Sequence, residues 1–393
     1  MPSAVIVDAI RTPSGRGKPG GSLDPLHPVD LLAQTLQALV ERTGVDPFLV
    51  EDVIGGCVSQ TGQQAVNVTR NAVLAAGFPE SVPAVTVDRQ CGSSQQATSF
   101  AAQGVIAGAY DVVIACGVEM MSHNPIGANS HGEDTYGVGG AARYPDGLVH
   151  QGISAELIAQ RWRLSRRQCD EFAAQSHQRA TEAHRSGAFD RERIAVRLPD
   201  GTEATVDETV RAATTTDGLA NLKPSFAEPQ YVDRFGDIDW VITAGNASPL
   251  TDGASAALIM SEERARVLGL TPRARFHSFA VTGSDPLLML TGVIPATELV
   301  LKKAGLSIDD IDTFEVNEAF APVPLAWLAE TGADPSRLNP RGGAIALGHP
   351  LGATGTKLLA TMINQLEATG GRFGLQTMCE GGGMANATIV ERL

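Results

Sequence analysis

Two stretches of the chain, about 260 residues apart, show the same order of predicted strands and helices. In the first stretch the expected strands are Ala4–Ala9, Val53–Ile54, Ala84–Val87 and Asp111–Ala115, and the expected helices are Val29–Thr43, Val66–Ala76 and Cys91–Gly108. In the second stretch the expected helices are Thr297–Ala304 and Gly352–Glu367, the expected strands are Thr313–Val316 and Gly374–Met378, and Gly343–Ala346 stands where the repeat would place another strand. Strands that alternate with helices indicate an α/β fold built in layers.

Three landmarks fall at matching places in the two stretches. These places are strand ends and strand-to-helix turns, and the matching pairs are Val58 with Asn317, Cys91 with His349, and Cys116 with Cys379. We therefore predict a duplicated domain, with residues 1–119 and 249–270 in the N-terminal half and residues 271–393 in the C-terminal half.

The stretch between the two halves, residues 120–248, breaks this pattern. It is rich in Gly, His, Arg and Asp, and its clearest helix is expected at Ser165–Arg185. Phe226–Trp240 is expected to be a loop with its own aromatic residues, Phe235 and Trp240. Long insertions of this kind in an α/β domain are usually functional. We predict a loop domain that covers the substrate.

The composition argues against several classes of protein. A net charge of −14 disfavours nucleic acid or an anionic membrane as the main partner. The N-terminus lacks a basic segment, and no apolar run is long enough to span a membrane. The five cysteines are odd in number, widely spaced and without a CxxC pair, so neither a disulfide framework nor a zinc site is expected. We expect a cytoplasmic protein with reduced thiols and no bound metal.

Cys91 directly follows a predicted strand and begins a predicted helix whose next residues are Gly and Ser. The free N–H groups and the dipole at a helix N-terminus stabilise a thiolate. A sharp strand–turn–helix connection also exposes the residue at the turn, as it does for the nucleophile of many hydrolases. Cys91 is therefore a candidate nucleophile, although its position alone also fits a small buried cysteine that packs the turn.

Three further segments could supply groups to the same edge of the fold. His349 lies in the Gly-rich segment 342–355, where backbone can approach a ligand closely, but the spacing fits neither common nucleotide-binding loop. Cys379 ends a predicted strand beside Gly381–Gly383, whose N–H groups suit an oxyanion hole and would lower the pKa of a neighbouring thiol. Asn317 ends another strand. Taken singly, each also fits an ordinary turn residue, strand connection or helix cap.

Taken together, these segments resemble the thiolase family of acetyl-CoA acetyltransferases and 3-ketoacyl-CoA thiolases. The similar blocks, in chain order, are Arg11–Pro13, the cysteine block Asp88–Ala97, the segments Thr243–Ser248 and Asp252–Ala254, the NEAF block Asn317–Phe320, the GHP block Gly348–Pro350 and the CxGGG block Cys379–Gly383. The resemblance spans essentially the whole chain. It implies two βαβαβαββ halves stacked in five layers, α-β-α-β-α, with an inserted loop domain.

The resemblance also implies a reaction, namely acyl transfer between thioesters through an acyl-cysteine intermediate. In this reaction Cys91 would attack C3 of a 3-oxoacyl-CoA, His349 would activate the thiols, and Cys379 would exchange the proton at C2. Asn317 would hold a water in one oxyanion hole, and the backbone N–H groups of Cys91 and Gly381 would form a second.

Coenzyme A would then be a substrate, with no bound cofactor needed. The residues expected to contact coenzyme A or the acyl group are His150, Gln151, Lys223, Ala247, Ser248 and Phe320. The resemblance further implies a homo-oligomer, either a dimer or a tetramer made of two dimers.

Two departures from the commonest pattern leave the acyl group open. His150-Gln151-Gly152 stands where acetoacetyl-specific members usually have His-Met-Gly, and Pro249 replaces a common glycine. A degradative enzyme of β-oxidation acting on a longer or steroid-derived chain and a biosynthetic acetoacetyl-CoA thiolase both fit. The rivals from other classes are a condensing enzyme of the ketoacyl-synthase kind, which Cys379 disfavours, and a catalytically silent acyl-CoA or sterol carrier, which the full set of catalytic groups disfavours.

Overall fold

The structure is a computed structural model that describes residues 3–236 and 238–393. The first half contains β1 (Ala4–Arg11), β2 (Gly15–Arg16), α1 (Pro28–Thr43), β3 (Asp52–Gly56), α2 (Val68–Ala75), β4 (Ala84–Val87), α3 (Ser93–Ala107), β5 (Val112–Met120), β8 (Thr251–Ser261) and α9 (Glu262–Val267). The second half contains β9 (Ala274–Gly283), α10 (Val293–Ala304), β10 (Thr313–Val316), α11 (Pro322–Thr331), α12 (Ala344–Leu347), α13 (Thr354–Thr369), β11 (Phe373–Glu380) and β12 (Met384–Arg392).

Most of the regular elements between β5 and β8 are helices, which are joined by long irregular segments. Its elements are α4 (Gly137–Arg143), α5 (Gln151–Arg161), α6 (Arg166–Arg185), β6 (Val196–Arg197), β7 (Glu203–Ala204), α7 (Thr216–Ala220) and α8 (Pro229–Phe235). The helix predicted at Ser165–Arg185 is α6, which begins with a capping box between Ser165 and Gln168. The loop predicted at Phe226–Trp240 is wrong in one respect, because Pro229 takes the first helical position and α8 forms there.

The pairing of the strands repeats in the two halves. The main sheet runs in the order β10-β11-β12-β9-β1-β8-β5-β3-β4, with β2 paired to β8. In the first half β3 is parallel to β5, and β5, β8 and β1 follow antiparallel; in the second half β10, β11, β12 and β9 repeat these relations. Within the main sheet, the two halves meet where Val5 and Ile6 of β1 pair with Ala274 and Arg275 of β9. The repeated pairing confirms the predicted duplication.

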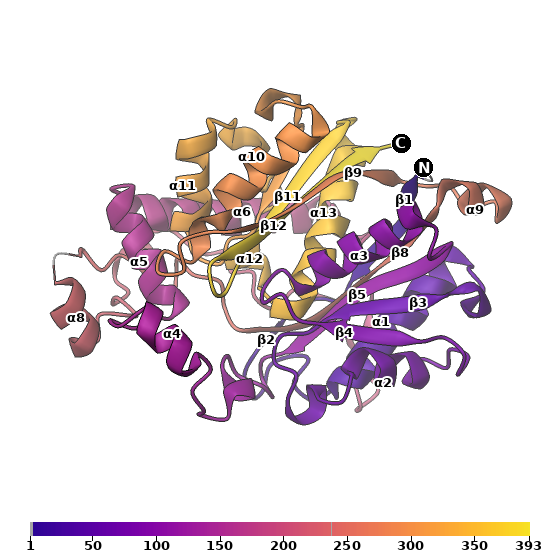
Figure 1. Cartoon of the computed structure of the whole chain (residues 1–393), viewed down its shortest axis with the longest axis horizontal. Helices are drawn as coiled ribbons and strands as arrows, with labels where there is room; N and C mark the ends of the chain where they lie inside the picture. Colours follow the sequence, from indigo (N-terminus) through magenta and orange to yellow (C-terminus); the bar gives the residue numbers. More distant parts are fainter. Residues whose placement is uncertain (1–2, 237) are drawn as a thin grey trace.

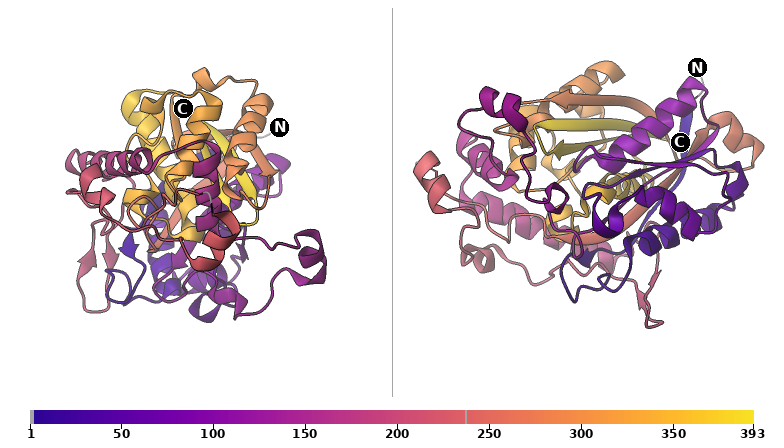
Figure 2. Two further views of the ribbon diagram at one scale, coloured as in Figure 1. Left: turned by 90° about the vertical axis from the view of Figure 1, so that its left-hand side faces the viewer. Right: turned by 60° about the horizontal axis from the view of Figure 1, so that its bottom comes forward.

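Helices and the two half-sheets are stacked in five layers (Figure 1; Figure 2 gives two further views). Helices α3 and α13 pack against each other between the half-sheets. Helices α1 and α2 cover the outer face of the first half-sheet, and α10 and α11 lie on the outer side of the second. This is the α-β-α-β-α arrangement that the resemblance implies.

Glycines let the central layer pack closely. A Cβ at Gly355 on α13 would lie 2.0 Å from the backbone N of Gln95 on α3, and a Cβ at Gly56 on β3 would lie 2.4 Å from the N of Ser94. The Thr356 N–H donates to Ser94 Oγ at 3.1 Å across the same contact. The first turns of α3 and α13 therefore lie side by side, and the residues that precede them are brought together.

One predicted strand is replaced by a short helix. Gly343–Ala346 stands where the repeat would place a strand, but Ala344–Leu347 forms α12, and the matching strand is reduced to an isolated parallel bridge between Phe314 and Leu338. The backbone of the segment bonds to side chains instead of a neighbouring strand, because Gly343 N donates to Ser176 Oγ and Ile345 N donates to Glu318. Because no strand pairing constrains it, the loop after α12 can enter the interior, where His349 is buried.

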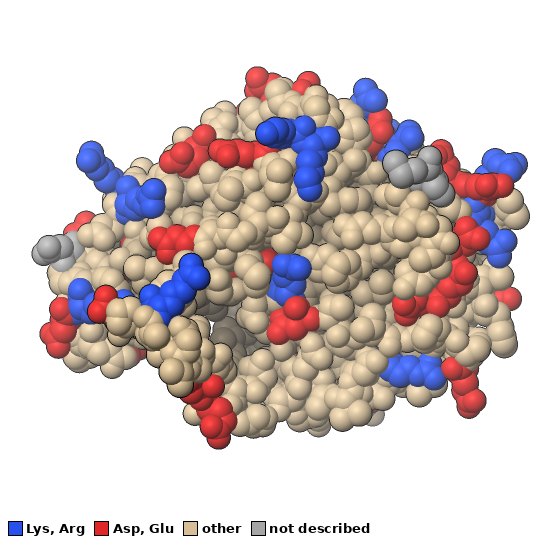
Figure 3. Space-filling view, in the orientation of Figure 1, with Lys and Arg blue, Asp and Glu red and all other residues tan. Residues whose placement is uncertain are grey.

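The surface shows no separation of charge on the face drawn in Figure 3. Lys and Arg side chains there are interspersed with Asp and Glu side chains. All five cysteines are buried free thiols. No helix in the described ranges has the length and apolar character that a membrane span requires.

Candidate active site

The four predicted catalytic residues lie at or just after the ends of strands and helices, and these elements come from both halves of the fold. Cys91 follows β4, Asn317 follows β10, His349 follows α12 and Cys379 lies near the end of β11. Asn317 Nδ2 lies 3.3 Å from His349 Nε2, and a charge on Cys379 would act directly on the thiol of Cys91. The fold therefore gathers at one place residues that are up to 288 positions apart in the sequence.

Cys91 lies in a tight turn between β4 and α3. Gln90 has a φ of +48°, a left-handed conformation that is uncommon for a residue with a side chain. The Ser93 hydroxyl donates to the carbonyl of Gln90 at 2.5 Å, and the Arg89 N–H donates to the Ser93 hydroxyl at 2.9 Å. The sharp turn is as predicted, but the thiol is not exposed: Cys91 is 7% exposed and packs with Met121 and Leu351.

Burial disfavours the thiolate form of both candidate thiols. Burial raises the pKa of Cys91 well above its ordinary value, and charges on Cys379 and Glu380 would raise it further. Burial also raises the pKa of Cys379 to about 12, with Glu380 adding to the shift. The expectations that the helix N-terminus gives Cys91 a thiolate and that the glycine N–H groups lower the pKa of Cys379 are therefore wrong here, because desolvation outweighs these dipoles.

The ring nitrogens of buried His349 have different partners. Nδ1 lies 2.7 Å from the hydroxyl oxygen of Thr354, and this hydroxyl donates to the carbonyl of Pro350 at 2.8 Å. The Thr354 oxygen therefore accepts from Nδ1–H, which leaves the lone pair on Nε2, facing the amide of Asn317. Burial and then the charge of Lys357 lower the pKa of His349 to about 3, so the ring is neutral.

The backbone around His349 is held by residues from the first half. Gly348 has a φ of +79°, and a Cβ there would lie 2.6 Å from the Thr251 side chain, so only glycine fits. The His349 N–H donates to Thr251 Oγ1 at 3.0 Å, and the Gly352 N–H donates to the buried carboxylate of Glu119 at 2.9 Å. The same carboxylate accepts two N–H groups from the segment after β3. These bonds join the His349 loop to the half that carries Cys91.

Two further predicted groups lie beside this centre. Asn317 Oδ1 is buried and has no hydrogen-bond partner among the described residues, so it can accept from a water or a substrate group. Gly381 begins the turn of three glycines between β11 and β12, and a Cβ there would lie 2.8 Å from the side chain of Gln90. The Gly381 turn therefore lies against the turn that carries Cys91.

A cavity of about 520 Å³ leads to His349. Five of the six residues predicted to contact coenzyme A or the acyl group line it, and these are His150, Gln151, Ala247, Ser248 and Phe320. The sixth, Lys223, is exposed and lies outside this lining, whereas Arg211 belongs to it. Met121 and Leu351, which pack against Cys91, also line the cavity, so its floor adjoins the thiol.

An aromatic cluster forms one wall of the cavity. The ring of Phe226 lies 5.2 Å from the ring of His150 and 6.1 Å from the ring of Phe320. A Cβ at Gly152 would lie 2.4 Å from the Phe226 ring, so glycine makes room for it. Ser248 N donates to the carbonyl of Ala319 at 3.0 Å, which ties the Ser248 segment to the NEAF block.

Sequence reasoning missed several residues of this site. Phe226 and Thr354 were not proposed for it, and Arg211 belongs to a stretch, residues 211–223, whose positive side chains were expected to be available to coenzyme A, but it was not singled out as a contact. A signal for Thr354 exists in the sequence, since it is a hydroxyl residue five positions after the histidine at the start of a predicted helix. Nothing in the local sequence distinguishes Phe226 or Arg211 from other surface residues. No group of three or more potential metal ligands occurs in the part of the chain that the structure describes.

Two models of known protein domains match consecutive parts of the chain. The model of the thiolase N-terminal domain matches residues 4–263, and the model of the thiolase C-terminal domain matches residues 270–392. The chain belongs to the thiolase family. It is an acyltransferase, and the predicted family, fold and enzyme class are confirmed.

Similar proteins span the whole chain. The steroid 3-ketoacyl-CoA thiolase FadA6 of Mycobacterium tuberculosis is 49% identical over 100% of this chain and 95% of its own length. The 3-ketoacyl-CoA thiolase of Yersinia pestis is 44% identical, with both chains fully covered. The crystal structure of the Bacillus anthracis acetyl-CoA acetyltransferase superposes with a TM-score of 0.89 at 36% identity and covers 100% of this chain and 99% of its own.

Proposed function

We propose that the protein is a degradative thiolase, which transfers the acyl group of a 3-oxoacyl-CoA to coenzyme A and releases acetyl-CoA. In the first half of the reaction the sulfur of Cys91 bonds to C3 while its proton passes to His349 Nε2. The bond between C2 and C3 then breaks, and its electron pair stays on C2 as the enolate of acetyl-CoA. Cys379 gives this enolate its proton, which leaves an acyl group on Cys91.

In the second half coenzyme A takes the acyl group from Cys91. The coenzyme A thiol loses its proton as its sulfur attacks the acyl carbon, and this proton and the one held on His349 restore the thiols of Cys91 and Cys379. The backbone N–H groups of Cys91 and Gly381 donate to the oxygen that becomes negative during each attack. Asn317, whose Oδ1 is free, holds a water in a second hole.

The observation that carries this proposal is the tautomer of His349. A proton acceptor must be neutral and must present a lone pair. The Thr354 hydroxyl binds Nδ1–H, so the lone pair is on Nε2, and the low pKa of His349 keeps the ring neutral. Cys379 meets the opposite requirement, since burial raises its pKa to about 12 and it keeps the proton that an enolate needs.

We further propose that the acyl group is larger than acetoacetyl. The cavity wall of His150, Phe226 and Phe320 offers aromatic surface to an apolar chain. The similarity to a steroid 3-ketoacyl-CoA thiolase supports a bulky, ring-containing group. The alternative is a biosynthetic acetoacetyl-CoA thiolase, which the similarity to an acetyl-CoA acetyltransferase of known structure favours.

Rates of thiolysis decide between these two. We would compare kcat/KM for acetoacetyl-CoA, for medium-chain 3-oxoacyl-CoA esters and for a 3-oxo steroid side-chain thioester, with Cys91→Ser as the blank. We expect at least about tenfold higher kcat/KM for the larger substrates, since each buried methylene contributes to binding. A preference for acetoacetyl-CoA would favour the biosynthetic enzyme, and no thiolysis of any ester would refute the proposal. Cytoplasmic location and assembly as a dimer or tetramer stay predictions.

A further inference from the structure

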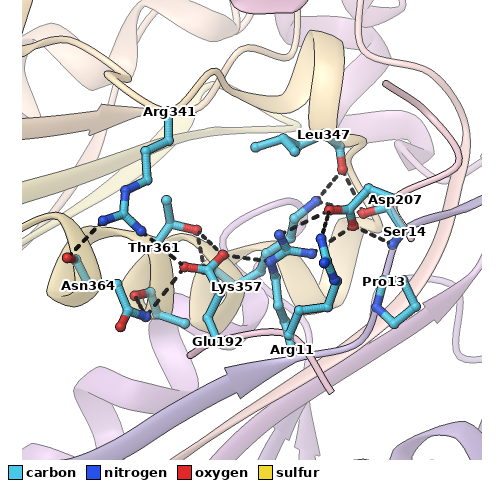
Figure 4. A network of polar contacts seen from close by, with 12 residues as sticks. Arg11, Pro13, Ser14, Glu192, Asp207, Arg341, Leu347, Lys357, Thr361 and Asn364 are labelled. Atoms are coloured by element: carbon cyan, nitrogen blue, oxygen red, sulfur yellow. Dashed lines mark hydrogen bonds and ion pairs between the residues drawn. The ribbon is translucent and has the colours of Figure 1, made fainter. Parts of the chain in front are cut away.

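Lys357 is a charged residue in the interior that the proposed reaction does not use. It lies in the first turns of α13 and is 4% exposed. Its ammonium group lies beside Ser14 and Leu347 (Figure 4) and donates to the hydroxyl of Ser14 at 3.0 Å and to the carbonyl of Leu347. It also donates to the carbonyl of Gly348 at 2.9 Å. All three N–H donors of the side chain are therefore used.

The two carbonyls that Lys357 binds come directly before His349. They end α12, where the last carbonyls of a helix have no partner within the helix. The Ser14 hydroxyl donates to the Leu347 carbonyl as well, at 2.6 Å. A cation suits this place, because carbonyl oxygens at a helix C-terminus carry partial negative charge.

Lys357 and Thr354 are three residues apart on α13 and so lie on the same side of the helix. Thr354 accepts from the Nδ1–H of His349, while Lys357 binds the backbone just before His349. One helix turn thus holds both the imidazole and the peptide chain that leads to it. Two separate contacts fix the ring more firmly than the Thr354 contact could alone.

The charges around Lys357 form a buried network that is drawn in Figure 4. Arg11 pairs with Asp207 and with Glu192, each at 2.7 Å. Burial and then the charge of Arg11 lower the pKa of Lys357 to about 7, while Asp207, Glu192 and Glu315 act to raise it. The charge of Lys357 in turn lowers the pKa of His349.

We propose that Lys357 is a positioning residue for His349: its ammonium group fixes the carbonyls of Leu347 and Gly348 and so keeps the imidazole in the orientation that pairs Nδ1 with Thr354 and turns the lone pair of Nε2 toward the amide of Asn317. This inference rests on the proposed function, in which Nε2 accepts the proton of Cys91. The charge of Lys357 also keeps the ring neutral before the reaction, because it disfavours the protonated ring.

The kinetic test compares Lys357→Met with Lys357→Arg. The Met variant keeps an unbranched apolar stem of similar length but binds neither carbonyl. We expect kcat to fall about 10- to 100-fold, the loss typical of hydrogen bonds to a charged group, with KM for the acyl-CoA within about twofold. The acid limb of the kcat–pH profile should move to higher pH, since the pKa of His349 rises without the neighbouring charge. Arg can still donate to both carbonyls and should restore most of kcat.

A matched control comes from the same network. Arg341 is also a buried cation, and it donates to the carbonyls of Ala188 and Asn364, away from His349. Arg341→Met should lower the melting temperature and leave both kcat and the pH profile unchanged. If Arg341→Met shifts the pH profile as much as Lys357→Met does, the effect belongs to the network as a whole and the positioning role is refuted.

A spectroscopic readout separates this inference from the proposed function. In protein labelled with ¹⁵N-histidine, the His349 signals are assigned by their loss in His349→Asn. The wild type should show an unprotonated Nε2 and a protonated Nδ1, and Lys357→Met should show a mixture of tautomers. If Lys357→Met does not fold, Ser14→Ala, which removes one donor to the Leu347 carbonyl, should give a smaller change of the same kind.

The outcomes are distinguishable. A wild-type protein without thiolysis would refute the proposed function but leave the tautomer of His349 measurable. A wild type with thiolysis, together with a Lys357→Met variant of normal kcat and normal His349 signals, would refute the positioning role alone.

Discussion

The turn that carries Cys91 and the loop that carries His349 occupy matching places in the two halves, but they are held in different ways. The Cys91 turn is stabilised mainly from within, by hydrogen bonds that link Arg89, Gln90 and Ser93. One bond comes from the other half, because Asn386 Nδ2 donates to the carbonyl of Gly92 at 3.0 Å. The His349 loop is stabilised from outside, by Thr251, which lies 98 residues away in sequence, and by Glu119, which lies 233 residues from its partner Gly352. The turn of the nucleophile therefore depends mainly on its own segment, whereas the loop of the base depends more strongly on the other half of the fold.

This difference follows from the loss of one strand. In the first half β4 pairs with β3 and delivers Cys91 at its end. In the second half the matching strand is reduced to the Phe314–Leu338 bridge, so no sheet contact guides the chain to His349. Hydrogen bonds to the side chains of Thr251 and Glu119 hold the loop in place instead. Substitutions far from the site should therefore disturb the base more readily than the nucleophile.

The largest effect is expected where the nucleophile itself is removed. Cys91→Ser should lower the rate of thiolysis by at least about 10³-fold, because a serine hydroxyl is a far weaker nucleophile than a thiol that His349 can deprotonate. Cys169, buried in α6, supplies the control, and Cys169→Ala should keep the wild-type rate. Initial rates with a 3-oxoacyl-CoA measure both. A Cys91→Ser variant of near-normal rate would remove Cys91 from the reaction.

Substitution of the second thiol, Cys379, should stop one half reaction and leave the other in place. Cys379→Ala should lose about 100-fold or more of the thiolysis rate, because no acid remains to protonate the enolate. Acetylation of Cys91 by acetyl-CoA should continue, since this half reaction moves no proton at C2. Exchange of the acetyl-CoA methyl protons with deuterated water, followed by NMR, should stop. Exchange at the wild-type rate would assign the acid to another group, with His349 the first candidate.

The support of the base by α13 should have an intermediate effect. Thr354→Val removes the acceptor for Nδ1–H with little change in shape, and we expect about a tenfold lower kcat with KM unchanged. Thr354→Ser keeps the hydroxyl and should keep the rate. Steady-state kinetics of the two variants check this. Equal rates for Val and Ser would mean that the tautomer of His349 is fixed by other contacts.

The smallest effects are expected at the rim of the cavity. Arg211 lines the cavity and should attract the phosphates of coenzyme A, so Arg211→Ala should raise KM for coenzyme A several-fold, by about 3- to 10-fold. Lys223→Glu should raise KM less, and more at low salt than at high salt. KM measured at two salt concentrations compares them. A larger effect at Lys223 than at Arg211 would place the phosphates outside the observed cavity.

Much of the fold and of the site could be predicted from the sequence. The order of strands and helices follows from local patterns, as for Ala84–Val87, which is found as β4 at the same residues. Cys91, Asn317, His349 and Cys379 were recognised because each lies in a short block similar to those of a known family.

What the sequence could not predict depends on distant contacts. Lys357 donates a hydrogen bond to Ser14, which lies 343 residues away in the sequence, and the sequence around neither residue indicates this contact. The pKa values of Cys91 and Cys379 were misjudged for the same reason, since the desolvation that raises them comes from side chains packed around them in space. The strand expected at Gly343–Ala346 fails because Ser176 and Glu318 bond to its backbone.

The acyl–Cys91 intermediate can be tested most directly by mass spectrometry. The protein is mixed with acetyl-CoA, quenched in acid and digested, and the peptides that carry an acetyl group are identified. We expect the adduct on the peptide that contains Cys91, in the wild type and in Cys379→Ala, and none in Cys91→Ser. An adduct on Cys57, Cys116 or Cys169, or an adduct that persists in Cys91→Ser, would contradict the assignment of the nucleophile.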